Sequence, residues 1–155
     1  MNEQFATLLT SRLEDLVKDL RYTYKPDGSE KAPQIVETML PRKDRSHQEG
    51  EEFPLVRWVI FNGEFARMSP APFSVKIDAG IYTGGSITDG TRDITELLLA
   101  LGKVVETPWY KPYKLRNPVK FALGSPDPHA QGIQPHPYYW ATLYLSFIVA
   151  TGHGG

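Results

Sequence analysis

The alternation of apolar and polar positions is clearest from residue 73 to residue 82, where it has the two-residue period of a β-strand. Phe, Val, Ile, Ala and Ile occupy the odd positions, while Ser, Lys, Asp, Gly and Tyr occupy the even ones. One face of this strand is therefore expected to be buried. The other face is expected to be hydrated or to meet a partner.

Two segments instead repeat their apolar residues every three or four positions, as an amphipathic helix does. We expect helices over residues 2–20 and 90–105. Asp89 is expected to cap the second helix, and Asp93 falls in its first turn, where the helix dipole favours an acid.

Four further segments are rich in β-branched and aromatic residues and are bounded by Pro, Gly or polar runs. They predict strands near 34–40, 54–62, 118–123 and 138–150, and the last is apolar on both faces, as in a central strand. The expected fold is a single α+β domain over residues 1–155, with a mixed or antiparallel sheet of about five strands and two helices packed on it.

Composition excludes several classes of function but adds little to the prediction of the fold. The chain has 155 residues, no Cys and a formal net charge of -1. The absence of Cys excludes thiolate nucleophiles, zinc–thiolate clusters and disulfides, and the charge argues against a surface that is basic overall. No targeting signal or membrane span is evident, so we expect a soluble cytosolic protein.

The corner between the strand at 73–82 and the second helix contains Gly84, Gly85 and Gly90, which raises the possibility of a phosphate cradle. The spacing matches neither GxGxxG nor GxxxxGK[ST], and Asp89 at the helix end would repel a phosphate. We interpret the corner as scaffold.

A Pro-rich loop carries Asp127, His129 and His136, which are metal-ligand types. Their spacing matches no recognised metal motif, so a solvated loop is the stronger interpretation and a metal-dependent enzyme the weaker one. No GxSxG or other nucleophile motif occurs. No catalytic residue, metal or cofactor is expected.

The stretch from residue 109 to residue 121 mixes cations with aromatic rings and contains no acid. Its members are Lys111, Lys114, Arg116, Lys120, Trp109, Tyr110, Tyr113 and Phe121. Such mixing suits a small nucleic-acid-binding module, in which bases stack on the rings. It also suits a protein interface, because Arg, Trp and Tyr are enriched at interface anchors, and we favour this alternative.

Signs of a protein partner are stronger than signs of a catalyst. Leu99 lies off the apolar stripe of the second helix, and the strand at 138–150 is apolar on both sides. Eight Tyr and three Trp add to the apolar surface of a small domain. Copies of the same chain would cover these surfaces in a closed ring or a two-fold pair.

The passage "VKIDAGIYTGGSITDGTRDITELLLAL" runs from an alternating strand through a turn into "DGTRDI" and an apolar helix. It follows an amphipathic N-terminal helix and a polar loop, and the chain ends in a long aromatic strand. In this order of features the chain resembles the tail terminator, or tail completion, proteins of long-tailed bacteriophages and prophages. The resemblance covers most of the chain as architecture and about Val75 to Val105 as sequence.

The resemblance implies a non-enzymatic structural subunit of a hexameric ring. Such a ring caps the tail tube, ends its polymerisation and joins the tail to the head connector, with DNA only passing through and no membrane involved. The subunit would occupy the host cytoplasm during assembly and then the virion tail. The residues expected at subunit or partner interfaces are Arg42, Lys43, Arg45, Leu99, Trp109, Tyr110, Tyr113 and Arg116.

Overall fold

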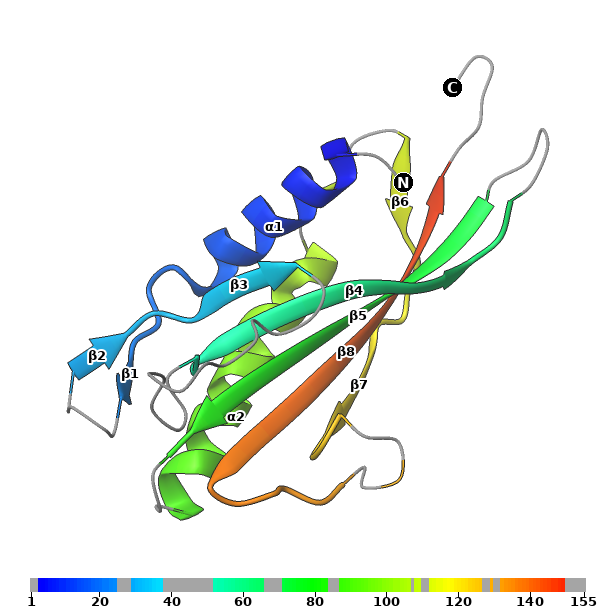
Figure 1. Cartoon of the computed structure of the whole chain (residues 1–155). Helices are drawn as coiled ribbons and strands as arrows, with labels where there is room; N and C mark the ends of the chain where they lie inside the picture. Colours follow the sequence, from blue (N-terminus) through cyan, green and yellow to red (C-terminus); the bar gives the residue numbers. More distant parts are fainter. Residues whose placement is uncertain are drawn as a thin grey trace, which may run out of the picture.

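Two long strands, β5 (Ala71–Tyr82) and β8 (Tyr138–Val149), form the centre of the fold and pair antiparallel along their whole length (Figure 1). The main sheet has the order β3–β4–β5–β8–β6, and β7 also pairs with β8. The other strands of this sheet are β3 (Gln34–Glu37), β4 (Leu55–Gly63), β6 (Tyr113–Leu115) and β7 (Lys120–Leu123). The computed structural model describes residues 3–24, 29–37, 52–65, 71–83, 87–106, 108–109, 112–126, 129 and 132–149.

The sheet is mixed, because β3 runs parallel to β4 while every other described pair in it is antiparallel. This arrangement confirms the α+β class with two helices on a sheet of about five strands; within the described residues the main sheet has six strands. The strand β8 is central, as its apolar pattern predicted. It has β5 on one side, and β6 and β7 one after the other on the second side.

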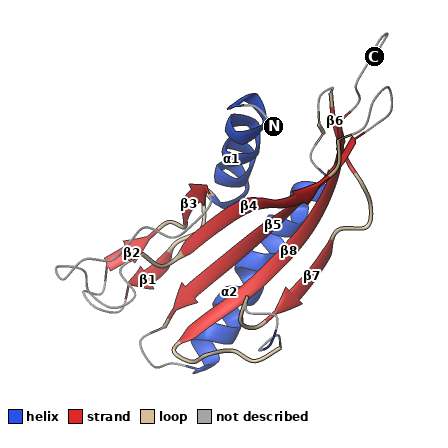
Figure 2. Cartoon of the chain, turned by 45° about the vertical axis from the view of Figure 1, so that its right-hand side comes forward, coloured by secondary structure: helices blue, strands red, loops and turns tan. Residues whose placement is uncertain are grey.

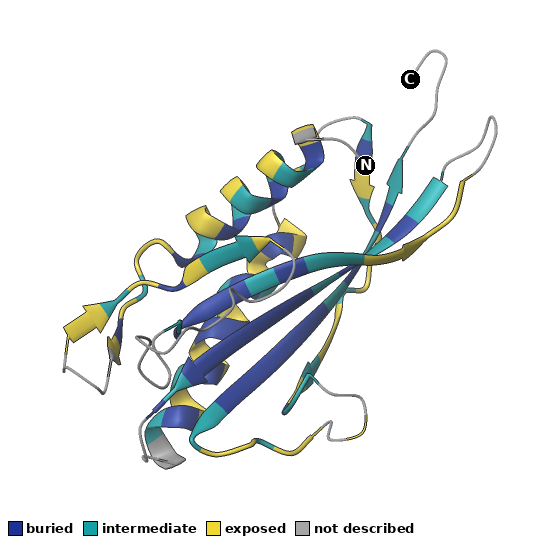
Figure 3. Ribbon diagram, viewed as in Figure 1, coloured by how far each residue is buried: buried dark blue, intermediate teal, exposed yellow. Residues whose placement is uncertain are grey.

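Both helices pack on the same face of the sheet. These are α1 (Glu3–Val17) and α2 (Ile87–Gly102), and a short 3₁₀ helix, η1 (Lys103–Glu106), continues α2. The apolar stripe of each helix meets the odd positions of β5 and β8, and Figure 3 shows the buried inner and exposed outer sides of α1 and α2. Phe5 of α1 lies at the centre of this core, with ring centroids of Phe73 and Phe147 at 5.0 and 5.2 Å.

The face of the sheet that neither helix covers, called here the open face, is only partly open. In Figure 2, α2 lies behind the strands and this face points towards the reader. The even positions of β5 belong to it and were expected to be hydrated or to meet a partner, but Asp78 and Gly80 are buried within the chain itself. A second apolar cluster of Phe53, Leu55 and Trp140 covers this end of the face, so that expectation was wrong for this half of the strand.

A short hairpin joins α1 to the sheet and was not expected from the sequence. Its strands are β1 (Tyr22–Tyr24) and β2 (Ser29–Lys31), which pair antiparallel. Tyr22 is buried, and its hydroxyl donates a hydrogen bond of 2.8 Å to Oε1 of Glu96 on α2. Burial and this carboxylate raise the pKa of Tyr22 well above its ordinary value, because both disfavour the phenolate.

The element boundaries differ from the expected ones mainly at the ends. The first helix ends at Val17 and not near residue 20, and the second begins at Ile87, ahead of the expected residue 90. Asp89 therefore lies in the first turn of α2 and does not precede the helix as an N-cap, which corrects that expectation.

Gly90 marks a close approach between α2 and β8. A Cβ atom at this position would lie 2.3 Å from Cε2 of Tyr139, a buried ring whose hydroxyl is also held at 2.8 Å by Nδ1 of His136. We therefore expect Gly90→Ala to lower the free energy of unfolding by about 2 kcal/mol, since steric strain exceeds the gain in helix propensity. Urea denaturation followed by circular dichroism measures the change.

Gly102→Ala is the matched control for this substitution. Gly102 ends the same helix, and a Cβ atom there has no heavy atom within 4 Å. Its replacement should leave stability unchanged or raise it by up to about 1 kcal/mol. Equal effects of the two substitutions would show that Tyr139 does not constrain α2.

Candidate functional site

The corner between β5 and α2 has the structure expected of scaffold at the residues that the structure describes. The carboxylate of Asp89 pairs with Arg92 one turn later, at 2.9 Å. Gly90 lies against the Tyr139 ring, so its lack of a side chain serves packing. Gly84 and Gly85 lie outside the described residues.

The histidine loop shows no assembled metal centre among the described residues. His129 and His136 are exposed, and no group of three or more His, Asp or Glu side chains that could hold a metal occurs in the part of the chain described. Asp127 lies outside that part. The proximity of His136 to the Tyr139 hydroxyl ties this loop to the start of β8.

The basic and aromatic stretch divides between the core and the surface. Trp109 packs on Phe147, with centroids 4.9 Å apart, and the guanidinium of Arg12 lies over its ring at 5.1 Å. Tyr113 is buried, and burial raises the pKa of its phenol. These two rings therefore offer little surface for bases or a partner, whereas Arg116 is exposed. Tyr110 and Lys111 lie outside the described residues.

One group of exposed apolar side chains on the helix side lies where α2 and η1 run beside β7. Leu99, Val105 and Phe121 are exposed by 66%, 44% and 62%. They line one groove of about 380 Å³, whose floor includes Leu143. Leu123, two residues after Phe121 on β7, is exposed by 41%. We call these four exposed side chains the edge patch.

The register of β7 explains why the edge patch forms. Phe121 pairs with Leu143 of β8, so its side chain emerges on the face that carries the helices. The structure pairs β7 with β8 alone, so its outer edge has no strand partner among the described residues. An exposed strand edge flanked by apolar side chains is a template for association with another chain.

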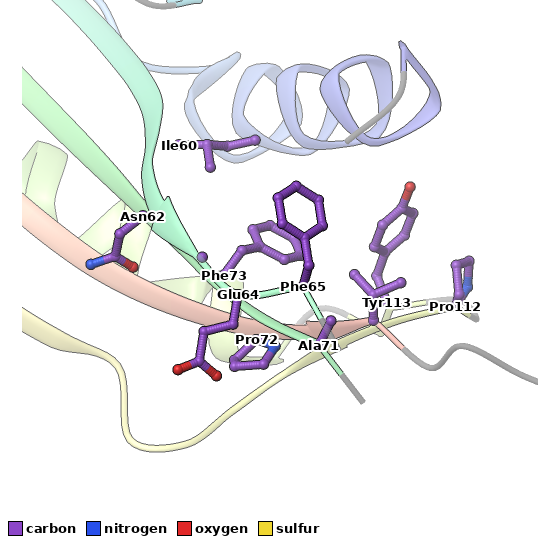
Figure 4. Close-up of a pocket in the computed structure, with 11 residues that line it drawn as sticks. Ile60, Asn62, Glu64, Phe65, Ala71, Pro72, Phe73, Pro112 and Tyr113 are labelled. Atoms are coloured by element: carbon purple, nitrogen blue, oxygen red, sulfur yellow. The ribbon is translucent and has the colours of Figure 1, made fainter. Parts of the chain in front are cut away.

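A second apolar surface lies at the far end of the β4–β5 hairpin. It is a groove of about 590 Å³, called here the hairpin groove. Figure 4 shows Phe65 standing beside Phe73 and Tyr113 under the start of α1. Phe65 is fully exposed, and Ile60 and Val149 are among the other apolar residues of the lining. A register shift between Ile60 and Asn62 interrupts the β4–β5 pairing just before this end.

No family model and no curated protein matches this chain. None of the described helices is long and apolar enough to cross a lipid bilayer.

The open face carries a buried polar centre. The Asp78 carboxylate is 1% exposed and accepts hydrogen bonds from Nε of Arg57 at 2.9 Å and from Oγ1 of Thr142 at 2.8 Å. Nζ of Lys76 lies 3.7 Å from the same carboxylate. The guanidinium of Arg57 in turn lies over the Trp140 ring at 5.8 Å. Each carboxylate oxygen thus has a partner within the sheet, so we interpret the centre as structural.

The residues expected at interfaces thus divide between the surface, the core and the segments outside the described residues. Leu99 and Arg116 are exposed, while Trp109 and Tyr113 pack against the core. Arg42, Lys43 and Arg45 lie outside the described residues. Sequence reasoning missed Phe121 as a member of an apolar patch, because only the pairing of β7 with β8 places it beside Leu99.

Proposed function

We propose that this protein is a structural subunit that associates with copies of itself into a ring capping a phage tail tube. The edge patch is the observation that carries the proposal. Large apolar side chains line one groove beside an unpaired strand edge, and isolated soluble proteins rarely leave such a surface uncovered. A second copy of the chain would bury it.

The presence of two separate apolar surfaces favours a ring over a two-fold pair. The edge patch and the hairpin groove share no residue. When one surface of a subunit meets a different surface of the next, the contact is head to tail, and repetition of that contact closes a ring if the rotation permits. A hexameric ring is the form that the resemblance to tail terminator proteins implies.

The proposed ring ends polymerisation of the tube and joins the tail to the head connector. Its partners would be the tail tube protein and the connector protein, with DNA passing through the centre. The polar loop that contains Arg42, Lys43 and Arg45 is proposed to contact those partners. The protein would act without catalysis, first in the host cytoplasm and then in the virion tail.

The association step is tested by light scattering across a wide range of protein concentrations. We expect the wild-type mass to rise towards a hexamer, because burial of the edge patch favours association. Phe121→Glu should shift the midpoint of association to at least tenfold higher concentration, since a carboxylate would have to be buried.

Ile133→Glu is the control, because Ile133 is exposed by 64% but lies outside both grooves. It should associate as the wild type does. A wild-type protein that stays monomeric at every concentration, both alone and in the presence of tail tubes, would contradict the proposal.

The capping step needs a second measurement. Purified protein added to polymerising tail tube subunits should shorten the tubes and place a ring at one end, as seen by electron microscopy. Phe121→Glu should leave tube length unchanged. Rings that form but never bind tubes would retain self-association and refute the tail terminator assignment.

A further inference from the structure

The half of the open face that contains Tyr144, Ser146 and Ile148 of β8 is more exposed than the buried half around Asp78. Tyr144, Ser146 and Ile148 of β8 point to this face and are partly exposed. Their side chains alternate with Leu143, Leu145 and Phe147, which enter the core on the helix side. This half of the sheet is therefore a partly hydrated surface within the described structure.

Cations gather on this half because of the strand register. Lys76 of β5 and Lys120 of β7 both pair with Tyr144, so the three side chains form one row across neighbouring strands. Lys114 of β6 pairs with Ile148 and therefore shares the same face. The backbone NH of Arg116 donates to the Ser146 carbonyl at 2.8 Å, so the pairing with β8 extends to Arg116. Arg116 is two residues after Lys114 and therefore lies on the same face.

Among the described residues, acids on the open face are few and mostly neutralised. Asp78 is buried against Arg57 and Lys76, which together carry more charge than its carboxylate. Glu64 lies at the rim, beyond the end of β4. Lys114, Arg116 and Lys120 are exposed and have no ion pair with any described residue. The face is thus positive, although the whole chain has a net charge of -1.

We infer that this half of the open face binds the phosphate backbone of a single-stranded nucleic acid. Exposed lysine and arginine neutralise phosphates, and the release of condensed counterions drives such binding. A sheet surface with a central aromatic ring suits a single strand, whose unstacked bases can lie on the ring. In the row of Lys76, Tyr144 and Lys120 the ring lies between two cations.

Nucleic-acid binding on the open face does not require ring formation, because it involves neither the edge patch nor the hairpin groove. It also changes the interpretation of the stretch at 109–121. Its cations Lys114, Arg116 and Lys120 lie on the open face, whereas the rings of Trp109 and Tyr113 pack in the core. Tyr144, from a different strand, supplies the stacking surface.

Edge strands also carry lysine simply to prevent sheet-to-sheet aggregation. Under that explanation the three exposed cations would not act together on one ligand. Binding of a single strand, its salt dependence and the location of the residues responsible distinguish the two explanations.

The experiment measures the fluorescence anisotropy of a labelled, mixed-sequence single-stranded DNA of about 16 nucleotides, at salt concentrations from about 50 to 200 mM. The test variant combines Lys114→Ala, Arg116→Ala and Lys120→Ala. It should bind at least tenfold more weakly at the lowest salt concentration. The slope of log K against log salt concentration should fall in magnitude by about 2, from about 0.7 for each lost phosphate contact.

The control variant combines Lys18→Ala, Arg92→Ala and Lys103→Ala. These cations lie on or next to the helices, and their removal changes the net charge of the chain by the same amount. The control should bind as the wild type does. In addition, Tyr144→Leu should weaken single-strand binding by about tenfold, with a smaller change in the salt slope, because it removes stacking and no charge.

Three results would overturn the inference. The first is absence of binding by the wild type at the lowest salt concentration. The second is equal weakening by the test and control variants, which would indicate a response to net charge alone. The third is tighter binding of a duplex of the same sequence than of the single strand, unaffected by Tyr144→Leu. Circular dichroism of each variant verifies that it is folded.

Discussion

Replacement of Asp78 by alanine should lower the free energy of unfolding by about 3 kcal/mol or more, the largest effect expected of any polar substitution in the described structure. The Asp78 carboxylate is 1% exposed and is the common partner of Arg57, Lys76 and Thr142. Its removal would leave two cations and a hydroxyl in a largely dehydrated place without their acceptor. Chemical denaturation, at a concentration where wild type and variant have the same mass, measures the loss.

A double-mutant cycle separates this effect from simple loss of packing. Arg57→Met keeps an apolar chain of similar length over Trp140 and removes the charge. If the ion pair is the cause, the double variant should be more stable than the sum of the two single losses predicts, because neither charge is left unpaired. Strict additivity would mean that the Arg57–Asp78 contact at 2.9 Å contributes no coupling energy.

Phe5→Ala should destabilise the protein by about 3 to 5 kcal/mol through loss of apolar burial and creation of a cavity. Phe5 is completely buried, and its ring contacts aromatic rings from both the sheet and the segment that follows η1. Thermal and urea denaturation, analysed together, measure the change in free energy.

Phe65→Ala provides the matched comparison, since it deletes the same atoms from a side chain that is fully exposed. Its effect on the stability of the monomer should be within about 0.5 kcal/mol. Destabilisation by Phe65→Ala equal to that by Phe5→Ala would mean that the hairpin groove, not the interior under α1, holds the fold together.

The sequence predicted the long elements well because each has a strong periodic pattern. The alternation in β5 extends through a strand of 12 residues and the apolar stripe in α2 through a helix of 16 residues, so each period repeats several times. The apolar character of β8 on both sides correctly indicated a central strand. A long helix or strand that buries one whole face carries its own periodic pattern of apolar residues. Its approximate position in the sequence could therefore be predicted without knowledge of the fold.

Short elements could not be derived in this way. Strands β1, β2 and β6 each contain three residues, which is too few for any period to be recognised. β1 and β2 pair only with each other, whereas β6 forms because β8 presents a strand edge to it, which is a tertiary effect. The burial of Asp78 has the same origin, since Arg57 and Thr142 come from other strands and their register was not known.

The candidate surfaces were predictable only in part. Leu99 was identified because it lies off the helix stripe, a purely local property. Phe121 was interpreted as one of several rings interleaved with lysines, whereas the pairing of β7 with β8 turns its ring to the helix side and Lys120 to the open face. Neighbouring residues in a strand point to opposite faces of the sheet. The cations and rings of the stretch at 109–121 are therefore separated onto two faces once its strands pair with β8.

The late position of β8 in the described sequence also determines when the sheet and the edge patch can form during synthesis. β8 is the last described strand to leave the ribosome, yet β6 and β7 have no other strand partner among the described residues, and β5 has only β4 until β8 is made. Phe121 gains its place beside Leu99 only after β8 has paired with β7. A nascent chain therefore lacks the edge patch until β8 has been synthesised and has paired with β7.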